Sequence, residues 1–243
     1  MKNVALVTGA SKGIGAATAK LLAKQGYAVC VNYHHSKDNA DNVVSQINTT
    51  GGHAISVKAD MGCEKEIIVM FEKIDQKLGP VTALVNNAGT NGGICEVENI
   101  SMDRLNQVFA TNVYGTFIAC REAIKRMKNN GGGSIVNVSS EAAKFGGNQI
   151  THYAASKAAI NAFTIGFARE VAPFGIRVNA VSPGVIDTEM HHSSPPERIA
   201  NLIKSLPMGR MGKTDEVAEL IKWLISDESS YISGAIIPIT GSR

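Results

Sequence analysis

The sequence predicts a single-domain α/β protein in which helices cover both faces of a doubly wound, seven-stranded parallel sheet. Two observations predict this fold. Short β-branched runs alternate with longer segments of helical periodicity, and neither a Pro/Ser-rich linker nor an internal repeat divides the 243 residues. Several expected strands are almost continuously apolar, as in strands that are buried on both faces of a parallel sheet. The alternation implies right-handed crossovers between the strands.

The expected elements follow one another in strict alternation along most of the chain. The expected strands cover residues 4–8, 28–32, 54–58, 83–86, 134–139, 177–182 and 235–239. The expected helices cover residues 14–24, 37–48, 64–78, 102–128, 153–171 and 215–225. Thr214 precedes two acids and is the expected N-terminal cap of the last helix. Residues 187–205 are irregular and are expected to form a mobile loop or a helical flap.

Composition excludes several classes of protein. A hydrophobic fraction of 44 % and a charged fraction of 19 % exclude a disordered or fibrous chain. The net charge is only +3, and the densest basic cluster, Lys125-Arg126-Met127-Lys128, is best explained as cations on the last turn of a helix. We therefore expect no nucleic-acid partner. No apolar run approaches the ~20 residues of a membrane span, so no membrane partner is expected.

The cysteines and the N-terminal segment indicate a reducing compartment. Cys30, Cys63, Cys95 and Cys120 lie far apart and form neither a CxxC pair nor a Cys/His cluster. This spacing favours a protein without disulfides, structural zinc or another metal. The opening apolar run ends at Gly9 and is shorter than the core of a signal peptide. We expect a cytoplasmic protein.

A glycine-rich turn follows the first expected strand. The segment Thr8-Gly9-Ala10-Ser11-Lys12-Gly13-Ile14-Gly15 leads directly into a helix. Glycines let the backbone approach a ligand closely, and a helix N-terminus offers free N–H groups to a phosphate. The pattern GxxxGxG differs from the dinucleotide fingerprint GxGxxG and lacks the Gly-Lys-Ser/Thr of a P-loop. We interpret it as a dinucleotide cradle.

Two alternatives to that interpretation stay open. Residues 9–13 also fit GxSxG, the nucleophile elbow of hydrolases, in the required strand–turn–helix context. That elbow needs an oxyanion donor from an earlier loop, and only eight residues precede Gly9. The other alternative is a turn with a purely structural role.

A tyrosine and a lysine are spaced for acid–base chemistry. Tyr153 and Lys157 are four residues apart and therefore lie on one face of a helix. A tyrosine pKa of about 10 is too high for proton transfer at neutral pH, and a nearby ammonium lowers it. Ser140 follows an expected strand, at the sheet edge where ligands bind in open α/β proteins. For the pair alone, a snorkelling lysine beside a packed tyrosine is the alternative; its occurrence together with the glycine turn favours catalysis.

Over essentially its full length the chain resembles the short-chain dehydrogenase/reductase family. The motifs that carry the resemblance are residues 8–15, Asn86-Asn87-Ala88-Gly89, Asn112, Ser140, Tyr153 with Lys157, and Pro183-Gly184. The resemblance is nearest to members like 3-oxoacyl-carrier-protein reductase and glucose dehydrogenase. It implies a Rossmann-type domain, with dinucleotide binding by residues 1–140 and with catalysis and substrate binding by residues 140–243. It also implies hydride transfer between a nicotinamide cofactor and a carbonyl/alcohol pair.

The same resemblance implies the role of each catalytic residue. Tyr153 would donate the proton in reduction, and Ser140 would polarise the carbonyl group. Ser140 is preferred to Ser139 because the family's serine lies about thirteen residues before its tyrosine, as Ser140 does here. Lys157 would bind the nicotinamide ribose and lower the pKa of Tyr153. Asn112 would hold a water that links Lys157 to solvent.

Further residues are expected to contact the cofactor, Tyr153 and Lys157 included. The others are Gly9, Ser11, Lys12, Gly13, Ile14, Gly15, Asn32, Tyr33, His34, Ser36, Asp60, Met61, Asn87, Ala88, Gly89, Pro183, Gly184, Ile186 and Thr188. A solvated turn residue is the alternative for Asp60, and a simple strand-ending turn is the alternative for residues 86–89.

The end of the second strand favours NADP(H) over NAD(H). An NAD enzyme of this layout carries an acid there to bind the ribose 2′-hydroxyl. Here no acid occurs before Asp38, so nothing repels a 2′-phosphate, and Lys12, Ser36 and Lys37 are placed to attract it. NAD(H) remains possible, because Lys12 and Lys37 are alternatively explained as solvated side chains.

We therefore expect an NADP(H)-dependent oxidoreductase that interconverts a carbonyl and a secondary alcohol. Phe174 stands where carrier-protein reductases have a basic residue, which favours a small carbonyl, sugar or polyol substrate over an acyl carrier protein. Residues 90–99, 141–151 and 187–205 should line the substrate pocket, and no motif in them identifies the substrate. A 3-oxoacyl-carrier-protein reductase is the alternative within the family. A catalytically idle dinucleotide sensor or scaffold is the alternative of a different class.

Two expected helices carry more apolar residues than one buried stripe requires. The helix after Tyr153 has five alanines with Phe163 and Phe167, and residues 102–128 add Phe109 and Phe117. A second copy of the chain would cover these surfaces. We expect a homodimer at least, and a homotetramer through a further contact near the C-terminus, although Gly241-Ser242-Arg243 departs from the family's Asp-Gly-Gly ending.

Overall fold

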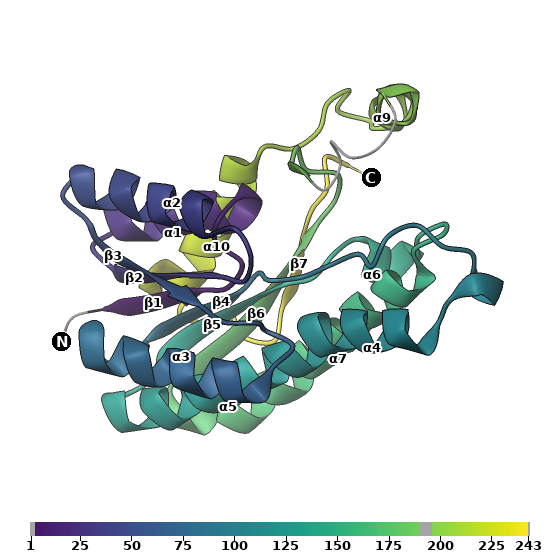
Figure 1. Ribbon diagram of the computed structural model, residues 1–243. Helices are drawn as coiled ribbons and strands as arrows, with labels where there is room; N and C mark the ends of the chain where they lie inside the picture. The colour runs from purple at the N-terminus through teal and green to yellow at the C-terminus, as the bar shows by residue number, and fades with distance from the viewer. Residues whose placement is uncertain (1–2, 190–195, 243) are drawn as a thin grey trace.

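One sheet of seven parallel strands forms the centre of the protein (Figure 1). The computed structural model describes residues 3–189 and 196–242. The strand order β3-β2-β1-β4-β5-β6-β7 is that of a doubly wound sheet, so the predicted fold class is confirmed. The strands are β1 (Val4–Val7), β2 (Ala28–Tyr33), β3 (His53–Lys58), β4 (Ala83–Asn86), β5 (Gly133–Val138), β6 (Ile176–Pro183) and β7 (Ile236–Ile239). Each lies within two residues of its predicted bounds.

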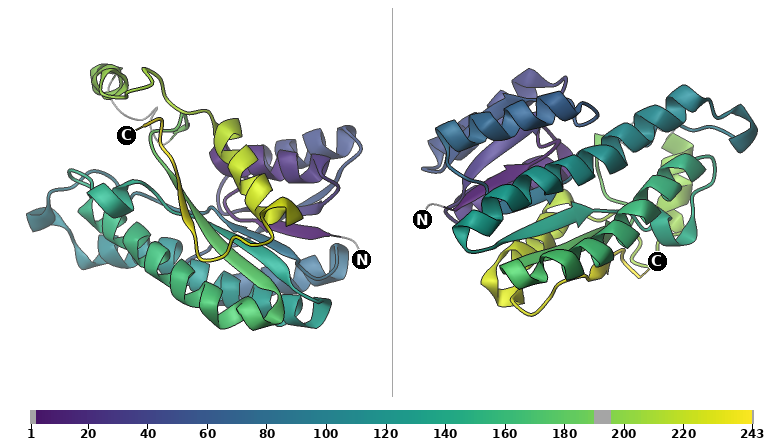
Figure 2. Two further views of the ribbon diagram at one scale, coloured as in Figure 1. Left: turned by 180° about the vertical axis from the view of Figure 1, so that it is seen from behind. Right: turned by 90° about the horizontal axis from the view of Figure 1, so that it is seen from below.

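Helices cover both faces of the sheet (Figures 1 and 2). One face is covered by α1 (Gly13–Lys24), α2 (Lys37–Thr49) and α10 (Thr214–Ile225), and the other by α3 (Glu64–Lys77), α5 (Gly115–Met127) and α7 (Thr151–Val171). Leu22, Val43 and Ile221 bury apolar side chains on the first face, and Phe71 and Met127 do so on the second. Because both faces are covered, the strands are apolar almost throughout.

The helix predicted for residues 102–128 is found as one continuous helical segment, but it contains a turn of a different type that the sequence did not predict. Helix α4 (Met102–Phe109) passes into a π-helical turn, Ala110–Tyr114, before α5 begins; a 3-10 turn, Lys128–Asn130, follows α5. Asn112 lies in the π-helical turn, where its side chain bonds to groups outside the helix. A π-helical turn accommodates an extra residue, and such turns are frequent at functional sites.

The predicted cap of the last helix is also wrong. Thr214 is the first helical residue of α10, and Lys213 occupies the cap position. The Lys213 backbone N–H donates to Glu216 Oε2 at 2.6 Å, so an acid three residues into the helix satisfies the free donor.

The connections contain further short helices. They are α6 (Ala142–Phe145), α9 (Pro196–Lys204) and the 3-10 turns Val97–Asn99, Ala172–Phe174 and Asp227–Ser229. Helix α9 supports the helical form of the flap predicted for residues 187–205. The part of that prediction that falls on residues 190–195 lies outside the described residues.

A buried chain of polar side chains fixes α7 against the sheet. Asn86 Nδ2 donates to Asn137 Oδ1 at 2.9 Å, and Asn137 Nδ2 donates to Thr164 Oγ1 at 2.9 Å. Since all three residues are buried, these bonds are shielded from competing water. They set the position of α7 along β4 and β5, and therefore the position of the residues at its N-terminal end.

Gly15 makes a close contact that a larger residue cannot make. A Cβ at this position would lie 2.5 Å from Asn87 Nδ2 and 2.6 Å from the Gly9 carbonyl oxygen. We expect Gly15→Ala to lower the free energy of unfolding by about 1–3 kcal/mol in chemical denaturation, as for other overpacked sites. Gly166→Ala in α7 is the control: a Cβ there meets nothing within 4 Å, and alanine stabilises a helix interior. Equal stability changes in the two variants would contradict the close contact.

Candidate active site

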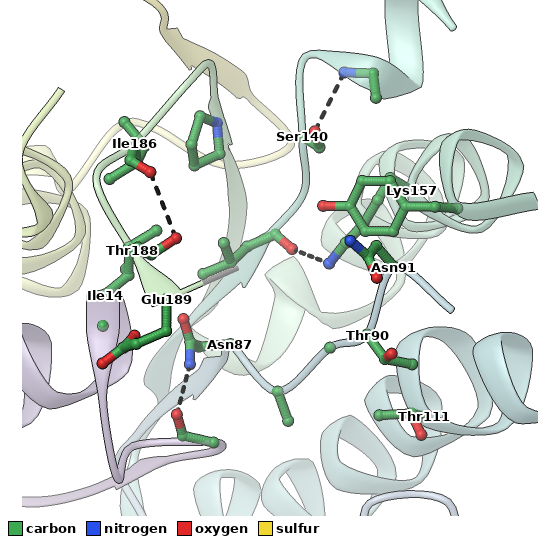
Figure 3. A pocket seen from close by; sticks show the side chains of 18 of the residues that line it. Ile14, Asn87, Thr90, Asn91, Thr111, Ser140, Lys157, Ile186, Thr188 and Glu189 are labelled. Atoms are coloured by element: carbon green, nitrogen blue, oxygen red, sulfur yellow. Dashed lines mark hydrogen bonds between the residues drawn. The ribbon is translucent and has the colours of Figure 1, made fainter. Parts of the chain in front are cut away.

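A cavity of about 950 Å³ opens at the carboxyl ends of the strands (Figure 3). It lies beside β1 and β4, where the strand order reverses, which is the usual ligand site of an open α/β sheet. The predicted site residues that line it are Gly9, Ser11, Lys12, Gly13, Ile14, Asn32, His34, Ser36, Asp60, Met61, Asn87, Ala88, Gly89, Ser140, Tyr153, Lys157, Pro183, Gly184, Ile186 and Thr188.

Three predicted site residues are not among those that line the cavity. Gly15 is buried against Asn87 and the Gly9 carbonyl group, so it supports the turn from behind. Tyr33 is the last residue of β2 and packs in the core on the α1 and α2 face. Asn112 is buried beneath the loop that follows β4. Surrounding residues of the same chain cover all three. Cofactor contact by Gly15 and Tyr33, and the binding of a water beside Lys157 by Asn112, stay predictions.

The glycine turn is shaped to receive an anion. Gly9 has a φ of +60°, and a Cβ on it would lie 2.8 Å from Ala88 Cα, so only glycine fits. Helix α1 begins at Gly13 with no side-chain cap and no acid in its first turn. Its first N–H groups have no partner within the helix and stand at the cavity wall. This donor set fits the pyrophosphate of a dinucleotide.

The side chains of Asn32 and Asn87 hydrogen-bond to the backbone and so hold the glycine turn in place. Asn32 Oδ1 accepts the Gly9 N–H at 3.0 Å, while its Nδ2 donates to the Ala59 carbonyl oxygen at 3.1 Å. Asn87 Nδ2 donates to the carbonyl oxygens of Thr8 at 2.9 Å and Gly9 at 3.0 Å. These bonds join the ends of β1, β2, β3 and β4 into one rigid edge beside the cavity.

Ser140, Tyr153 and Lys157 lie together at the other end of the cavity. Ser140 Oγ accepts the Ala142 N–H at 3.2 Å, and the Ser140 side chain also hydrogen-bonds Tyr153. Lys157 Nζ is 5.8 Å from the centre of the Tyr153 ring. Figure 3 shows Ser140 and Lys157 across the cavity from Ile14 and Thr188. The Ser139 hydroxyl instead donates to the Lys157 carbonyl oxygen at 3.2 Å, so the geometry favours Ser140 as the serine that meets a substrate.

Burial dominates the electrostatics of the pair. It raises the pKa of Tyr153 above its ordinary value, and the hydrogen bond with Ser140 offsets this only in part. Burial also lowers the pKa of Lys157 to about 8. The lowering of the Tyr153 pKa by Lys157 that the sequence predicts is not found in this structure. Burial is the largest cause of the Tyr153 shift, and Lys157 Nζ donates at 2.7 Å to the Val138 carbonyl oxygen.

Asn112 links three parts of the site without entering the cavity. Its Oδ1 accepts the Thr90 N–H at 2.9 Å, and its Nδ2 donates to the Thr90 carbonyl oxygen at 2.9 Å and to Ser156 Oγ at 3.0 Å. It therefore joins the loop after β4 to the helix that carries Tyr153 and Lys157. The exposed helical asparagine that sequence reasoning would otherwise assume is excluded, because Asn112 is buried.

The remaining lining residues define a substrate end of mixed polarity. They include Thr90, Asn91, Ile94, Gln107, Thr111, Glu141, Phe145, Asn148, Ile150, Ile199 and Leu202. All but Gln107 and Thr111 fall in the three segments that the sequence predicts to line the pocket. Gln107 and Thr111 are four residues apart at the end of α4, so helical spacing was the signal that could have found them. Glu189 of the predicted segment 187–205 also lines the cavity, as does His35, which was missed.

Comparisons with known proteins agree with this geometry. The family model described as "Enoyl-(Acyl carrier protein) reductase" matches residues 9–241. The chain is 49 % identical to the uncharacterized oxidoreductase YgfF of Escherichia coli, with 99 % of both chains covered. It is 38 % identical to a 3-oxoacyl-(acyl-carrier-protein) reductase of Thermotoga maritima, which covers 98 % of this chain and 96 % of the relative. It is 37 % identical to glucose 1-dehydrogenase 2 of Bacillus subtilis, with 98 % and 93 % covered.

One solved structure is similar to this chain over nearly its whole length. A short-chain dehydrogenase/reductase of Serratia marcescens with two Phe-to-Leu substitutions superposes with a TM-score of 0.93 at 36 % identity, covering 99 % of this chain and 97 % of that one. The fold and site are those of an oxidoreductase that acts on a CH–OH group with a nicotinamide dinucleotide. The chain belongs to the short-chain dehydrogenase/reductase family.

Other kinds of site were also sought in the described ranges, 3–189 and 196–242. No group of three or more His, Cys, Asp or Glu side chains is arranged there to hold a metal ion. No helix in those ranges is long and apolar enough to cross a membrane. Cys30 and Cys120 are buried, and all four cysteines are free.

Proposed function

We propose that the protein is an NADP(H)-dependent oxidoreductase that interconverts a small carbonyl compound, sugar or polyol and its secondary alcohol. One observation carries the proposal: Ser140, Tyr153 and Lys157 line the same cavity as the uncapped N-terminus of α1. A dinucleotide whose pyrophosphate lies at α1 reaches toward the Tyr153 end through this cavity. Residues 1–140 form the dinucleotide-binding part in this proposal, and residues 140–243 form the catalytic part with the flap.

Each residue has a defined task in the proposed reaction. The bound nicotinamide supplies the hydride in reduction and accepts it in oxidation. The Tyr153 hydroxyl gives its proton to the carbonyl oxygen, which the Ser140 hydroxyl holds by a hydrogen bond. The Lys157 ammonium holds the ribose hydroxyls and stabilises the phenolate that remains. Asn112 positions these groups, because it fixes α7 to the loop after β4.

The lining of the substrate end supports a small polar substrate. The amide and hydroxyl groups of Asn91, Gln107 and Thr111 suit the hydroxyls of a sugar or polyol, and Ile94 and Phe145 give an apolar wall. The glucose dehydrogenase among the relatives is consistent with this class. A panel of aldehydes, ketones and sugars, followed by the loss of NADPH absorbance, tests the proposal. Turnover of none of them would leave the idle dinucleotide sensor as the better description.

A 3-oxoacyl-carrier-protein reductase is the second candidate, because a relative has that name. Phe174 weakens it: its ring is 45 % exposed beside α7 and carries Lys128 Nζ 3.7 Å above it. A carrier protein is acidic and needs an exposed basic patch, and Lys128 is partly engaged here. The same assay with a 3-oxoacyl thioester distinguishes the two. A kcat/KM for the thioester above that for every free carbonyl would favour the carrier-protein enzyme.

The adenosine end of the cavity supports NADP(H). Lys12, His34 and Ser36 line it, and no carboxylate stands at the end of β2. Lys37, the other predicted cation, instead pairs with Asp41 on α2. We expect kcat/KM for NADPH to exceed that for NADH with the best substrate from the panel. A higher value for NADH would refute the assignment and leave NAD(H) as the cofactor.

The α5 and α7 surfaces support a homodimer, and a homotetramer through a further contact. The proposed location, the cytoplasm, rests on the cysteine spacing alone. Phe117 of α5 is 46 % exposed, and its ring lies 3.8 Å from that of Phe163, which in turn stacks on Phe167 at 5.0 Å. A second copy packed here would remove this aromatic surface from water. Light scattering at micromolar concentration should show a species of at least twice 25.7 kDa. A single species at the monomer mass would refute both assemblies.

A further inference from the structure

An imidazole stands at the adenosine end of the cavity, between groups of opposite charge. His34 follows β2, and its Nε2 lies 3.8 Å from Asp60 Oδ2. Its ring lies against that of His35, with 3.6 Å between the ring centres and the ring planes tilted by 36°. The side chain of His34 is 42 % exposed, so it is accessible to a ligand in the cavity that it lines. Neither imidazole takes part in the proton transfer or the hydride transfer proposed above.

The carboxylate beside His34 is held in place by the backbone around it. Asp60 Oδ1 accepts the Gly62 N–H at 2.8 Å, and the Asp60 backbone N–H donates to Glu66 Oε2 of α3 at 2.8 Å. Because both contacts are local, Asp60 keeps its carboxylate at the cavity wall whether or not His34 is charged. A 2′-phosphate at this end therefore meets a fixed negative charge.

The cations around His34 come from several elements. Lys12 of the glycine turn lines the cavity, and Lys58 ends β3 as the register partner of Tyr33. Lys37 opens α2 but is paired with Asp41. His35, Asp60 and Glu66 also lie around His34, and β2 and α2 further carry Tyr33 and Asp38. Lys12 and Asp60 carry opposite charges at the cavity wall, so a proton on His34 makes the local potential more positive.

We propose that His34 makes the choice between phosphorylated and unphosphorylated dinucleotide depend on pH. This inference rests on the proposed function. A protonated imidazole screens Asp60 and donates a charge-assisted hydrogen bond to a 2′-phosphate. A neutral imidazole leaves the phosphate facing Asp60, with Lys12 of the glycine turn as a cation at this end of the cavity. Imidazoles exchange this proton between pH 5 and pH 8, whereas a 2′-hydroxyl has no charge to sense it.

The test measures Kd for NADP⁺ and for NAD⁺ by calorimetry at pH 6 and pH 8, at constant ionic strength. The selectivity is the ratio of the NAD⁺ Kd to the NADP⁺ Kd. We expect the wild-type selectivity for NADP⁺ to fall about three- to fivefold from pH 6 to pH 8, the range for one exposed charge pair. The phosphate itself gains negative charge above about pH 6, which changes selectivity in the opposite direction.

Variants isolate the imidazole from the phosphate. His34→Gln should remove the fall in selectivity, and His34→Arg should keep high selectivity at both pH values, because arginine stays charged. His35→Gln changes the neighbouring imidazole and is the matched control. In this variant the selectivity for NADP⁺ should fall from pH 6 to pH 8 as it does in the wild type. A wild-type selectivity that does not fall, a His34→Gln variant that behaves as the wild type, or a fall removed by His35→Gln would overturn the inference. If neither dinucleotide binds, the proposed function fails with it; if both bind without this pattern, the inference alone fails.

Discussion

Tyr153→Phe is expected to lower kcat by about 100-fold or more while the Kd for the dinucleotide stays nearly unchanged. The substitution removes only the hydroxyl, and in the proposed reaction that hydroxyl carries the proton to the carbonyl oxygen; positioned acid–base groups typically contribute 10²–10⁴-fold. The phenylalanine ring fills the same half-buried place at the start of α7, so the fold is retained. Steady-state rates and equilibrium binding of NADP⁺ to the same preparations measure the two effects separately.

Tyr231→Phe is the matched control, because Tyr231 is fully exposed far along the chain from the cavity residues. It should change neither kcat nor dinucleotide binding. A Tyr153→Phe variant with nearly the kcat of the wild type would reject the assigned proton donor. Equal losses in both tyrosine variants would point to a general effect on folding rather than to chemistry.

Lys157→Met is expected to weaken dinucleotide binding, to lower kcat strongly and to move the pH–rate profile to higher pH. The binding loss follows from the missing ammonium at the proposed ribose site. The displacement follows from the proposed catalytic complex, in which the Lys157 ammonium stabilises a Tyr153 phenolate whose pKa burial raises. An unchanged profile in a variant with measurable turnover would contradict the electrostatic role of Lys157.

The same substitution should stabilise the protein without its cofactor near neutral pH. Burial lowers the pKa of Lys157 to about 8, so above pH 8 the folded chain has released a proton that the unfolded chain still binds. The free energy of unfolding of the wild type therefore rises with pH above pH 8. The methionine variant lacks this pH-dependent contribution. Its advantage in the free energy of unfolding should shrink by roughly 2–3 kcal/mol from pH 7 to pH 10. Urea denaturation at several pH values checks the sign, and a constant difference would contradict the burial of a charged lysine.

The sequence by itself determined the sheet, the order of its elements and most of the residues of the proposed site that line the cavity. The strands are identifiable because a parallel sheet covered on both faces needs unbroken apolar runs, a local property of segments such as residues 83–86. The glycine turn and the Tyr153–Lys157 spacing are local too, and both reach the one cavity. Since each of these patterns lies within a few residues, it can be recognised without knowledge of the tertiary structure.

Tertiary structure alone decided the features that depend on contacts between distant segments. The π-helical turn within residues 102–128 contains Asn112, which bonds Thr90 and Ser156, and helical periodicity carries no trace of those partners. Gly15 and Tyr33 lie next to cavity residues in sequence, but other residues of the same chain cover them in the fold. The pKa shift of Tyr153 is upward because desolvation depends on every group packed around the phenol, whereas the sequence specifies only the lysine four residues away.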